Sequence, residues 1–132
     1  GLKVISMSDA VDLAEQWRQK LNIRAIDPNA KVIELSGGNQ QKVVIAKALV
    51  QKPKLVIFDE PTRGVDVGAI AEIHHFINDL ADQGIAVVVI SSYLPEVLAV
   101  SDRILVARQG KIVEEMEPKS ATEEAIMYAA VH

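Results

Sequence analysis

Apolar and polar residues follow one another in patterns that predict both helices and strands. Near the amino terminus, apolar residues recur at helical spacing: Ala10, Leu13, Ala14, Trp17 and Leu21. Ser8 or Asp9 can cap this helix, and Asp27-Pro28 in the next loop interrupts the pattern, because the residue before proline disfavours helical conformation. A second helix is predicted from about Ser36 to Val50.

The middle of the chain alternates short apolar runs with one amphipathic helix. LVIF (55–58) is continuously apolar, which is typical of a strand covered on both faces, and IAVVVI (85–90) predicts a second buried strand. The helix between them is predicted from near Asp66 to Gly84, a residue that suits a left-handed C-cap. A strand, a helix and a strand in this order form a βαβ unit with parallel strands.

The last third predicts a short helix from near Pro95, a hairpin over 103–116 that turns at Gln109-Gly110, and a helix from Ser120 to Val131. The predicted fold class is therefore α/β, with a parallel βαβ core followed by a β-hairpin and helices.

Composition narrows the possible partners. The 132 residues include 14 Lys+Arg and 18 Asp+Glu, a net charge of -4, and no basic tract, which argues against a nucleic-acid partner. There is no cysteine, and the longest aliphatic run is far shorter than the roughly 20 residues that span a bilayer. We therefore expect any membrane association to be through a partner protein. The first residues do not have the pattern of a signal peptide.

Polar residues follow both predicted strands. Ligands of open α/β sheets bind outside the carboxyl ends of the strands, so Asp59, Glu60 and Ser92 are expected to share one crevice. Adjacent carboxylates suit metal-assisted phosphoryl transfer, with Asp59 holding Mg²⁺ and Glu60 accepting a proton from water. On spacing alone, a merely polar exit from the strand explains Asp59-Glu60-Pro61 equally well.

LSGGNQQK (35–42) places two glycines at the start of the second helix. The first amides of a helix lack internal acceptors, and glycine lets an anion approach them closely, so Ser36, Gly37 and Gly38 form a plausible phosphate cradle. Taken alone, the stretch is better explained as a glycine-rich turn capped by Ser36. Lys42 and Lys47 are most simply the solvated side of this helix, although both can reach acidic neighbours.

Four motifs in order resemble the ATP-binding cassette (ABC) family. LSGGNQQKVVIAKAL is similar to its signature motif, LVIFDEPT to its Walker B strand and catalytic glutamate, RGVD (63–66) to its D-loop, and SSYLPEVL (91–98) to its switch region. The residues within these motifs resemble, in detail, those of the second nucleotide-binding domain of bacterial ribose- and galactose-type sugar importers. The resemblance runs from about Ala14 to the carboxyl terminus.

The resemblance implies a role for each matching residue. Asp59 would assist Mg²⁺ and Glu60 would polarise the attacking water. The signature residues would contact the γ-phosphate of an ATP bound mainly by an opposite nucleotide-binding domain, and Asp66 would act across the interface of a head-to-tail dimer. The signature residues concerned are Ser36, Gly37, Gly38, Asn39 and Gln41. By the same resemblance, residues 1–51 would belong to a helical subdomain, and residues 52–132 would carry the Walker B, D-loop, switch and carboxyl-terminal elements.

Two departures from the family pattern change this expectation. No GxxxxGK[ST] loop occurs in the 132 residues, so the chain resembles the carboxyl-terminal portion of a P-loop NTPase domain and is expected to bind ATP poorly by itself. The switch position, where the family usually has histidine, is Ser92, which offers neither a cation nor a second ring nitrogen. We therefore expect slow hydrolysis at the site that contains Glu60, while the signature serves a competent site.

The function expected from the resemblance is that of a sugar-importing ATPase subunit on the cytoplasmic side of a bacterial inner membrane, bound to transmembrane permease subunits. Two alternatives stay open: a non-transport relative that acts on nucleic acid or ribosomes, and a docking module that needs no nucleotide.

Overall fold

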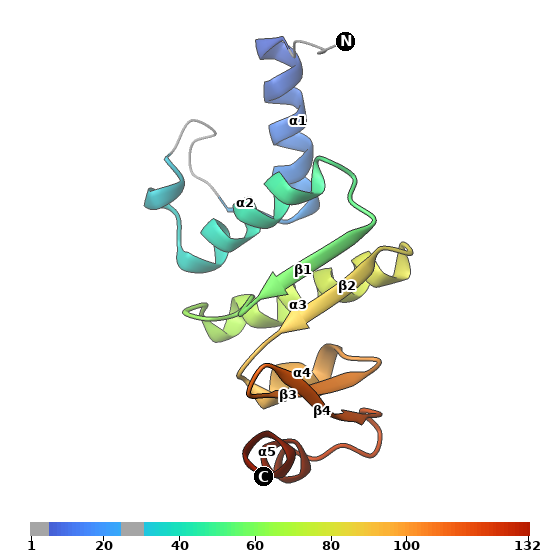
Figure 1. Cartoon of the computed structure of the whole chain (residues 1–132). Coiled ribbons are helices and arrows are strands. Elements are labelled where there is room, and N and C mark those ends of the chain that lie inside the picture. Colours follow the sequence, from blue (N-terminus) through green and yellow to red (C-terminus); the bar gives the residue numbers. More distant parts are fainter. Residues whose placement is uncertain (1–5, 25–30) are drawn as a thin grey trace. The chain divides into compact units, whose positions relative to one another are not determined.

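A computed structural model describes residues 6–24 and 31–132, and the Asp27-Pro28 loop lies outside these ranges. The elements in chain order are α1 (Met7–Lys20), the 3-10 helix η1 (Val32–Glu34), α2 (Gly37–Leu49), β1 (Leu55–Asp59), α3 (Val67–Asp82), β2 (Ala86–Ile90), α4 (Leu94–Val100), β3 (Ile104–Arg108), β4 (Lys111–Met116) and α5 (Glu123–Val131) (Figure 1). The structure confirms the predicted α/β class, and its described residues form one parallel and one antiparallel strand pair. None of the helices in the described ranges is long and apolar enough to cross a membrane.

The chain divides into two units. The first comprises Gly1–Lys54 and Thr62–Phe76, and the second comprises Leu55–Pro61 and Ile77–His132. Helix α3 begins in the first unit and ends in the second. Each unit has its own buried apolar residues.

Helix α1 of the first unit starts earlier than the sequence predicts. Ser6 caps it by accepting from the Asp9 amide at 3.1 Å, and the Asp9 carboxylate accepts from the Ser6 amide at 3.4 Å. The prediction that Ser8 or Asp9 is the cap is wrong, because Asp9 instead supplies the acidic half of this capping box. The buried apolar residues of the unit come mainly from the end of α1, from α2 and from α3: Leu21, Ile23, Ile45, Ala46, Leu49, Ile73 and Phe76.

Strands β1 and β2 of the second unit pair in parallel, as the βαβ pattern predicts, with Leu55 opposite Ala86 and Asp59 opposite Ile90 (Figure 1). The prediction that both strands are buried on both faces is wrong. Val56 and Phe58 are buried, whereas Leu55 and Ile57 are 51% and 60% exposed. Side chains of a strand alternate between the two faces of the sheet, so only one face of β1 is covered.

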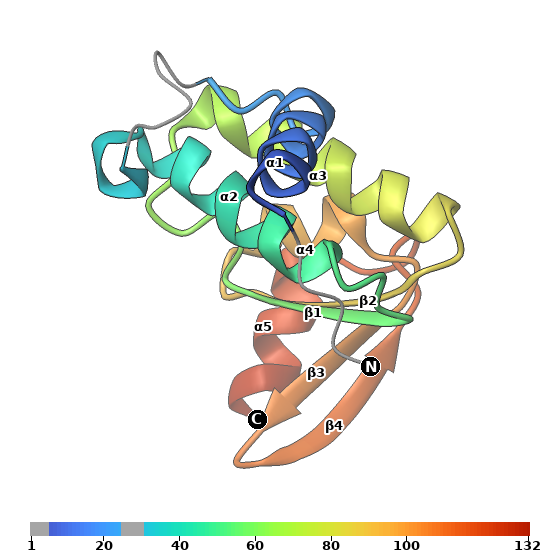
Figure 2. The same cartoon turned by 90° about the horizontal axis from the view of Figure 1, so that it is seen from above.

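The hairpin of β3 and β4 turns at Gln109-Gly110, as predicted. Both residues have positive φ, 49° and 75°, the combination that a two-residue type I′ turn requires. Ile104 and Val106 of β3 pack with Ile126 of α5 in a small core, and the hairpin and α5 lie side by side in Figures 1 and 2. Gly84 ends α3 with φ 83°, which confirms the predicted left-handed position.

Candidate functional site

The carboxyl edge of the β1–β2 pair brings together the polar residues that follow each strand. The Glu60 amide continues the ladder by donating to the Ile90 carbonyl at 2.8 Å. The Ser92 amide then donates to Oε1 of Glu60 at 3.0 Å. The predicted convergence of Glu60 and Ser92 at one edge of the sheet is therefore confirmed, and it arises from the parallel register of the two strands.

Glu60 has an unfavourable backbone conformation. Its φ is 48°, in the left-handed region that few residues other than glycine, asparagine and aspartate adopt readily. The ladder bond from its amide and the bond to its carboxylate hold it there, one on the backbone and one on the side chain. Strain of this kind concentrates at functional positions, where the surrounding structure fixes it.

Asp59 is the last residue of β1, and its side chain is exposed at the same edge. Within 6–24 and 31–132, no three His, Cys, Asp or Glu residues cluster closely enough to hold a metal ion between them. A single exposed carboxylate still fits Mg²⁺, because this ion usually keeps several waters and takes one or two carboxylates together with substrate phosphates. The donor set suits a metal that arrives with a nucleotide.

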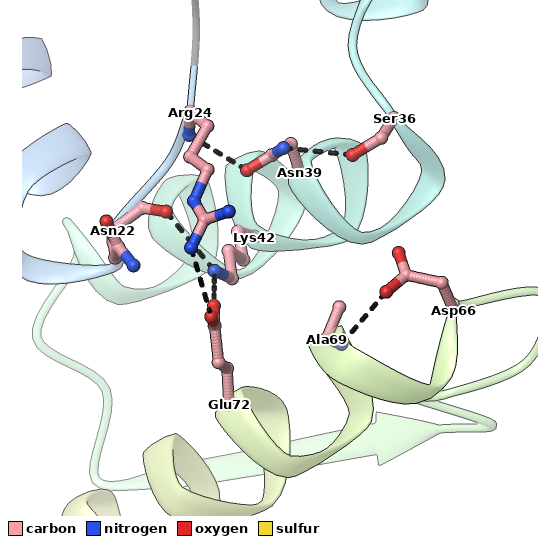
Figure 3. Close-up of polar contacts among 8 residues, drawn as sticks. All are labelled: Asn22, Arg24, Ser36, Asn39, Lys42, Asp66, Ala69 and Glu72. Carbon is pink, nitrogen blue, oxygen red and sulfur yellow. Dashed lines mark hydrogen bonds and ion pairs between the residues drawn. The ribbon is translucent and has the colours of Figure 1, made fainter.

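The start of α2 differs from an ordinary capped helix. Ser36 is at the N-cap position, but its side chain makes no capping bond to the helix backbone. Its Oγ instead accepts from Nδ2 of Asn39 at 2.9 Å, and Oδ1 of Asn39 accepts from the Arg24 amide at 2.9 Å (Figure 3). Ser36 and Gly37 are exposed, Gln41 is half-buried on the same helix, and Gly38 is buried. A serine side-chain cap therefore does not explain this turn.

Asp66 lies directly before α3 in the first unit. Its Oδ1 accepts from the Ala69 amide at 3.1 Å, so the carboxylate caps the helix that follows the D-loop (Figure 3). Glycines 37 and 38 of the signature motif lie against this segment. The signature and the D-loop residues thus belong to one unit, and Asp59, Glu60 and Ser92 belong to the other.

Lys42 corrects the prediction that it lies on the solvated side of its helix. It is only 6% exposed, and its Nζ pairs with the Glu72 carboxylate of α3 and donates to the Asn22 carbonyl at 3.2 Å (Figure 3). Arg24 approaches the other Glu72 oxygen at 3.9 Å. The alternative that this lysine reaches an acidic neighbour is the correct one, whereas Lys47 is exposed as predicted.

The pairing alters the acidity of Glu72. The hydrogen bond from Lys42 lowers the pKa of the Glu72 carboxyl below its ordinary value of 4.5, against the opposing effects of partial burial and of the nearby Asp66 charge. Neither Glu72 nor Arg24 stood out in the sequence. A signal for Lys42 was present, because it occupies the helical face defined by the buried residues Gly38, Ile45, Ala46 and Leu49.

Comparison with known proteins agrees with these observations. Residues 5–63 match the family model described as "ABC transporter". The chain is 55% identical over 127 residues to the ribose import ATP-binding protein RbsA of Caldanaerobacter subterraneus subsp. tengcongensis, covering 96% of this chain and 26% of that protein. It is 51% identical to the xylose import ATP-binding protein XylG of Geobacillus kaustophilus, covering 96% of this chain and 25% of that protein. The chain thus spans about a quarter of the length of these curated relatives.

Solved structures show the same fold. The bacterial ABC transporter cassette MJ0796, described as dimeric, superimposes with a TM-score of 0.77 at 25% identity, over 89% of this chain and 51% of that one. The ATP-binding cassette MJ1267 gives a TM-score of 0.74 at 31% identity, over 95% of this chain and 48% of that one. Sequence and fold together show that the chain belongs to the ABC transporter family of ATP-binding proteins.

Proposed function

We propose that this chain is part of the ATP-binding subunit of a bacterial carbohydrate importer, in which ATP binding and hydrolysis drive sugar uptake. The observation that carries the proposal is the fixed position of Glu60, in a strained conformation at the carboxyl edge of the sheet and bonded to the Ser92 amide. Relatives named for ribose and xylose import, similar over nearly the whole chain, support the substrate class.

The reaction assigned to this edge is hydrolysis of the terminal phosphoanhydride of ATP. Glu60 accepts a proton as water attacks the γ-phosphorus, the bond to the bridging oxygen breaks, and ADP and phosphate form. Asp59 would hold Mg²⁺, directly or through water, and the ion would supply neutralisation of phosphate charge. Ser92 supplies a hydroxyl where the family usually has histidine, so this site turns over slowly.

The signature residues serve a second ATP, held mainly by an opposite domain. Ser36, Gly37 and Gly38 present the first amides of α2 to its γ-phosphate, where the helix dipole favours an anion. Asn39 and Gln41 belong to the same cradle, and Asp66 acts across the domain interface. The exposure of Ser36 and Gly37, and the lack of a side-chain cap on α2, support this role.

The same proposal covers organisation, partners and location. Residues 1–51 form part of a helical subdomain with the signature motif, and residues 52–132 carry the Walker B, D-loop, switch and carboxyl-terminal elements. The subunit pairs head to tail with another nucleotide-binding domain and binds permease subunits at the cytoplasmic side of the inner membrane. A relative that acts on nucleic acid is less consistent with the net charge of -4 and the lack of a basic tract.

The proposal is tested in the intact protein that contains this chain, reconstituted with its membrane partners. Gly37→Asp puts a negative charge at the cradle and is expected to reduce ATPase activity by about 100-fold, as loss of a transition-state donor does. Glu60→Gln is expected to cost less, since it affects the slower site. Gly37→Ala is the uncharged control.

Equal or reversed losses for Gly37→Asp and Glu60→Gln would contradict the assignment of the slow site. ATP-dependent uptake of radiolabelled ribose, xylose or galactose into vesicles tests the transport function. ATPase activity that responds to nucleic acid or ribosomes, and not to a sugar-loaded binding protein, would favour the non-transport alternative. Sugar uptake that stays undiminished when this chain binds no nucleotide would favour a docking module.

A further inference from the structure

The second signature glycine lies in close contact with the helix that follows the D-loop. A Cβ atom built on Gly38 would lie 2.7 Å from Cβ of Ala69, 3.5 Å from Cγ1 of Val65 and 3.6 Å from Oδ2 of Asp66. Non-bonded carbon atoms prefer about 3.5–4.0 Å, so any side chain at position 38 forces α2 and α3 apart. Gly37 is also close, with its Cβ position 3.2 Å from the Gly64 carbonyl oxygen.

Backbone conformation does not explain the glycine at position 38. Gly38 lies inside α2, and the glycines of the described chain with positive φ are Gly64, Gly84 and Gly110. In a regular helix, alanine is more favourable than glycine. The sequence therefore gives up helix propensity at Gly38, and the space that is left is filled by the first turn of α3.

We propose that Gly38 is a positioning residue: its missing side chain lets α3 lie against α2, and so holds Asp66 and the D-loop beside the signature motif. Its backbone amide, at the second position of α2, has no acceptor within the helix. The consequence for ATP hydrolysis rests on the function proposed above, whereas the packing role does not.

The ion pair of Lys42 and Glu72 extends the same contact. Lys42 is four residues after Gly38 on α2, and Glu72 is three residues after Ala69 on α3, so the pair lies about one turn further along both helices (Figure 3). Close backbone approach at one turn and a buried cation at the next fix the two helices together. The signature motif and the D-loop then move as one body within this unit.

The alternative is that Gly38 is glycine only to admit a phosphate. The two explanations differ in nucleotide-free protein. If only phosphate access matters, Gly38→Ala leaves stability unchanged or raises it, because alanine favours the helix. If packing matters, the same substitution lowers stability, and removing the opposing methyl group restores it.

The experiment compares Gly38→Ala, Ala69→Gly and the double variant in the intact protein, by thermal melting without nucleotide. We expect Gly38→Ala to lower the melting temperature by several degrees. Ala69→Gly also lowers it, through helix propensity, yet the double variant is expected to regain at least half of the loss caused by Gly38→Ala. Gly68→Ala is the matched control, since its Cβ would have only an ordinary contact of 3.4 Å with Oδ1 of Asp66.

Additive losses in the double variant, or a melting temperature of Gly38→Ala at or above that of the wild type, overturn the packing role. If Gly38→Ala does not fold, recovery of folded protein by the double variant supports the role, and failure to recover overturns it.

The ATPase rate, measured below all the melting temperatures, tests the positioning role. We expect Gly38→Ala to lose at least tenfold in rate and the double variant to regain most of it. A double variant that melts like the wild type but remains inactive overturns this role. In that case ATP hydrolysis requires the absence of a side chain at position 38 for a reason other than packing against α3. A wild-type protein without ATPase activity refutes the proposed function, and the melting comparison still decides the packing role.

Discussion

Ser92 is bonded to Glu60 through its backbone amide, so its side chain is not what fixes the carboxylate. A different side chain at this position therefore leaves the hydrogen bond in place. We predict that Ser92→His raises the ATPase rate of the slow site about tenfold, because imidazole adds a ring nitrogen able to bind phosphate or orient water. Steady-state ATPase assays of the intact protein measure this gain.

The gain must depend on Glu60 if the two residues share one site. Ser92→His combined with Glu60→Gln is the control, and it is expected to show no gain over Glu60→Gln alone. An unchanged rate in the single variant would mean that something other than the switch side chain limits this site.

At the scale of elements, the contact between α2 and α3 includes a buried cation. Lys42→Met leaves Glu72 and the Asn22 carbonyl without their donor and is expected to destabilise the protein by about 1–2 kcal/mol. The cost stays below the roughly 3–5 kcal/mol of a fully buried pair, because the Glu72 side chain is 40% exposed. Urea unfolding measures the change, with exposed Lys47→Met as the matched control, expected within about 0.5 kcal/mol of the wild type.

The same pair makes stability depend on pH. The pKa of Glu72 is lower in the folded protein than its ordinary value of 4.5, so the ionised form stabilises the fold at neutral pH. This contribution is complete above about pH 4.5 and is lost as the pH falls through the folded value. We predict that the difference in free energy of unfolding between wild type and Glu72→Gln is constant near neutrality and shrinks in acid.

Urea unfolding at a series of pH values measures this difference. In the Lys42→Met background, where the main cause of the lowered pKa is gone, Glu72→Gln is expected to give a much smaller pH dependence. An equal dependence in both backgrounds would show that Lys42 is not the cause.

Most elements were predictable, because each has a local signal: helical periodicity in α3, apolar runs in β1 and β2, and Gln109-Gly110 in the hairpin. The cap of α1 was misplaced because three neighbouring residues, Ser6, Ser8 and Asp9, can all accept from helix amides. The exposed face of β1 could not be predicted, since an apolar run indicates what a strand can bury and not what covers it.

At the scale of the molecule, the candidate residues fall into two groups. Motif order and parallel pairing placed Glu60 and Ser92 together in advance, because strand ends in a βαβ unit share one edge. Glu72 and Arg24 were not predictable, since they are an ordinary helix acid and a loop cation until tertiary contacts bring Lys42 and Arg24 to the two oxygens of the Glu72 carboxylate. Local sequence patterns therefore predict the candidate ligand-binding residues more successfully than the residues that hold α2 and α3 together.

The motif content of the chain leads to one further prediction. None of the 132 residues belongs to a GxxxxGK[ST] loop, whose backbone amides and lysine supply most of the contacts to the β- and γ-phosphates. The chain by itself is therefore expected to bind Mg-ATP with a Kd weaker than about 1 mM, less than roughly 4 kcal/mol of binding free energy. Isothermal titration calorimetry measures this affinity, and micromolar binding would contradict the role assigned to the opposite domain.

The left-handed backbone of Glu60 affects which substitutions evolution favours at position 60. Asparagine or glycine would relax the strain there, so drift toward greater stability favours replacing the glutamate. Glutamate at this position therefore gives up stability that asparagine or glycine would provide. In a lineage where this site no longer needs to hydrolyse ATP, position 60 is where relaxed selection is expected to appear first, as a gain in stability.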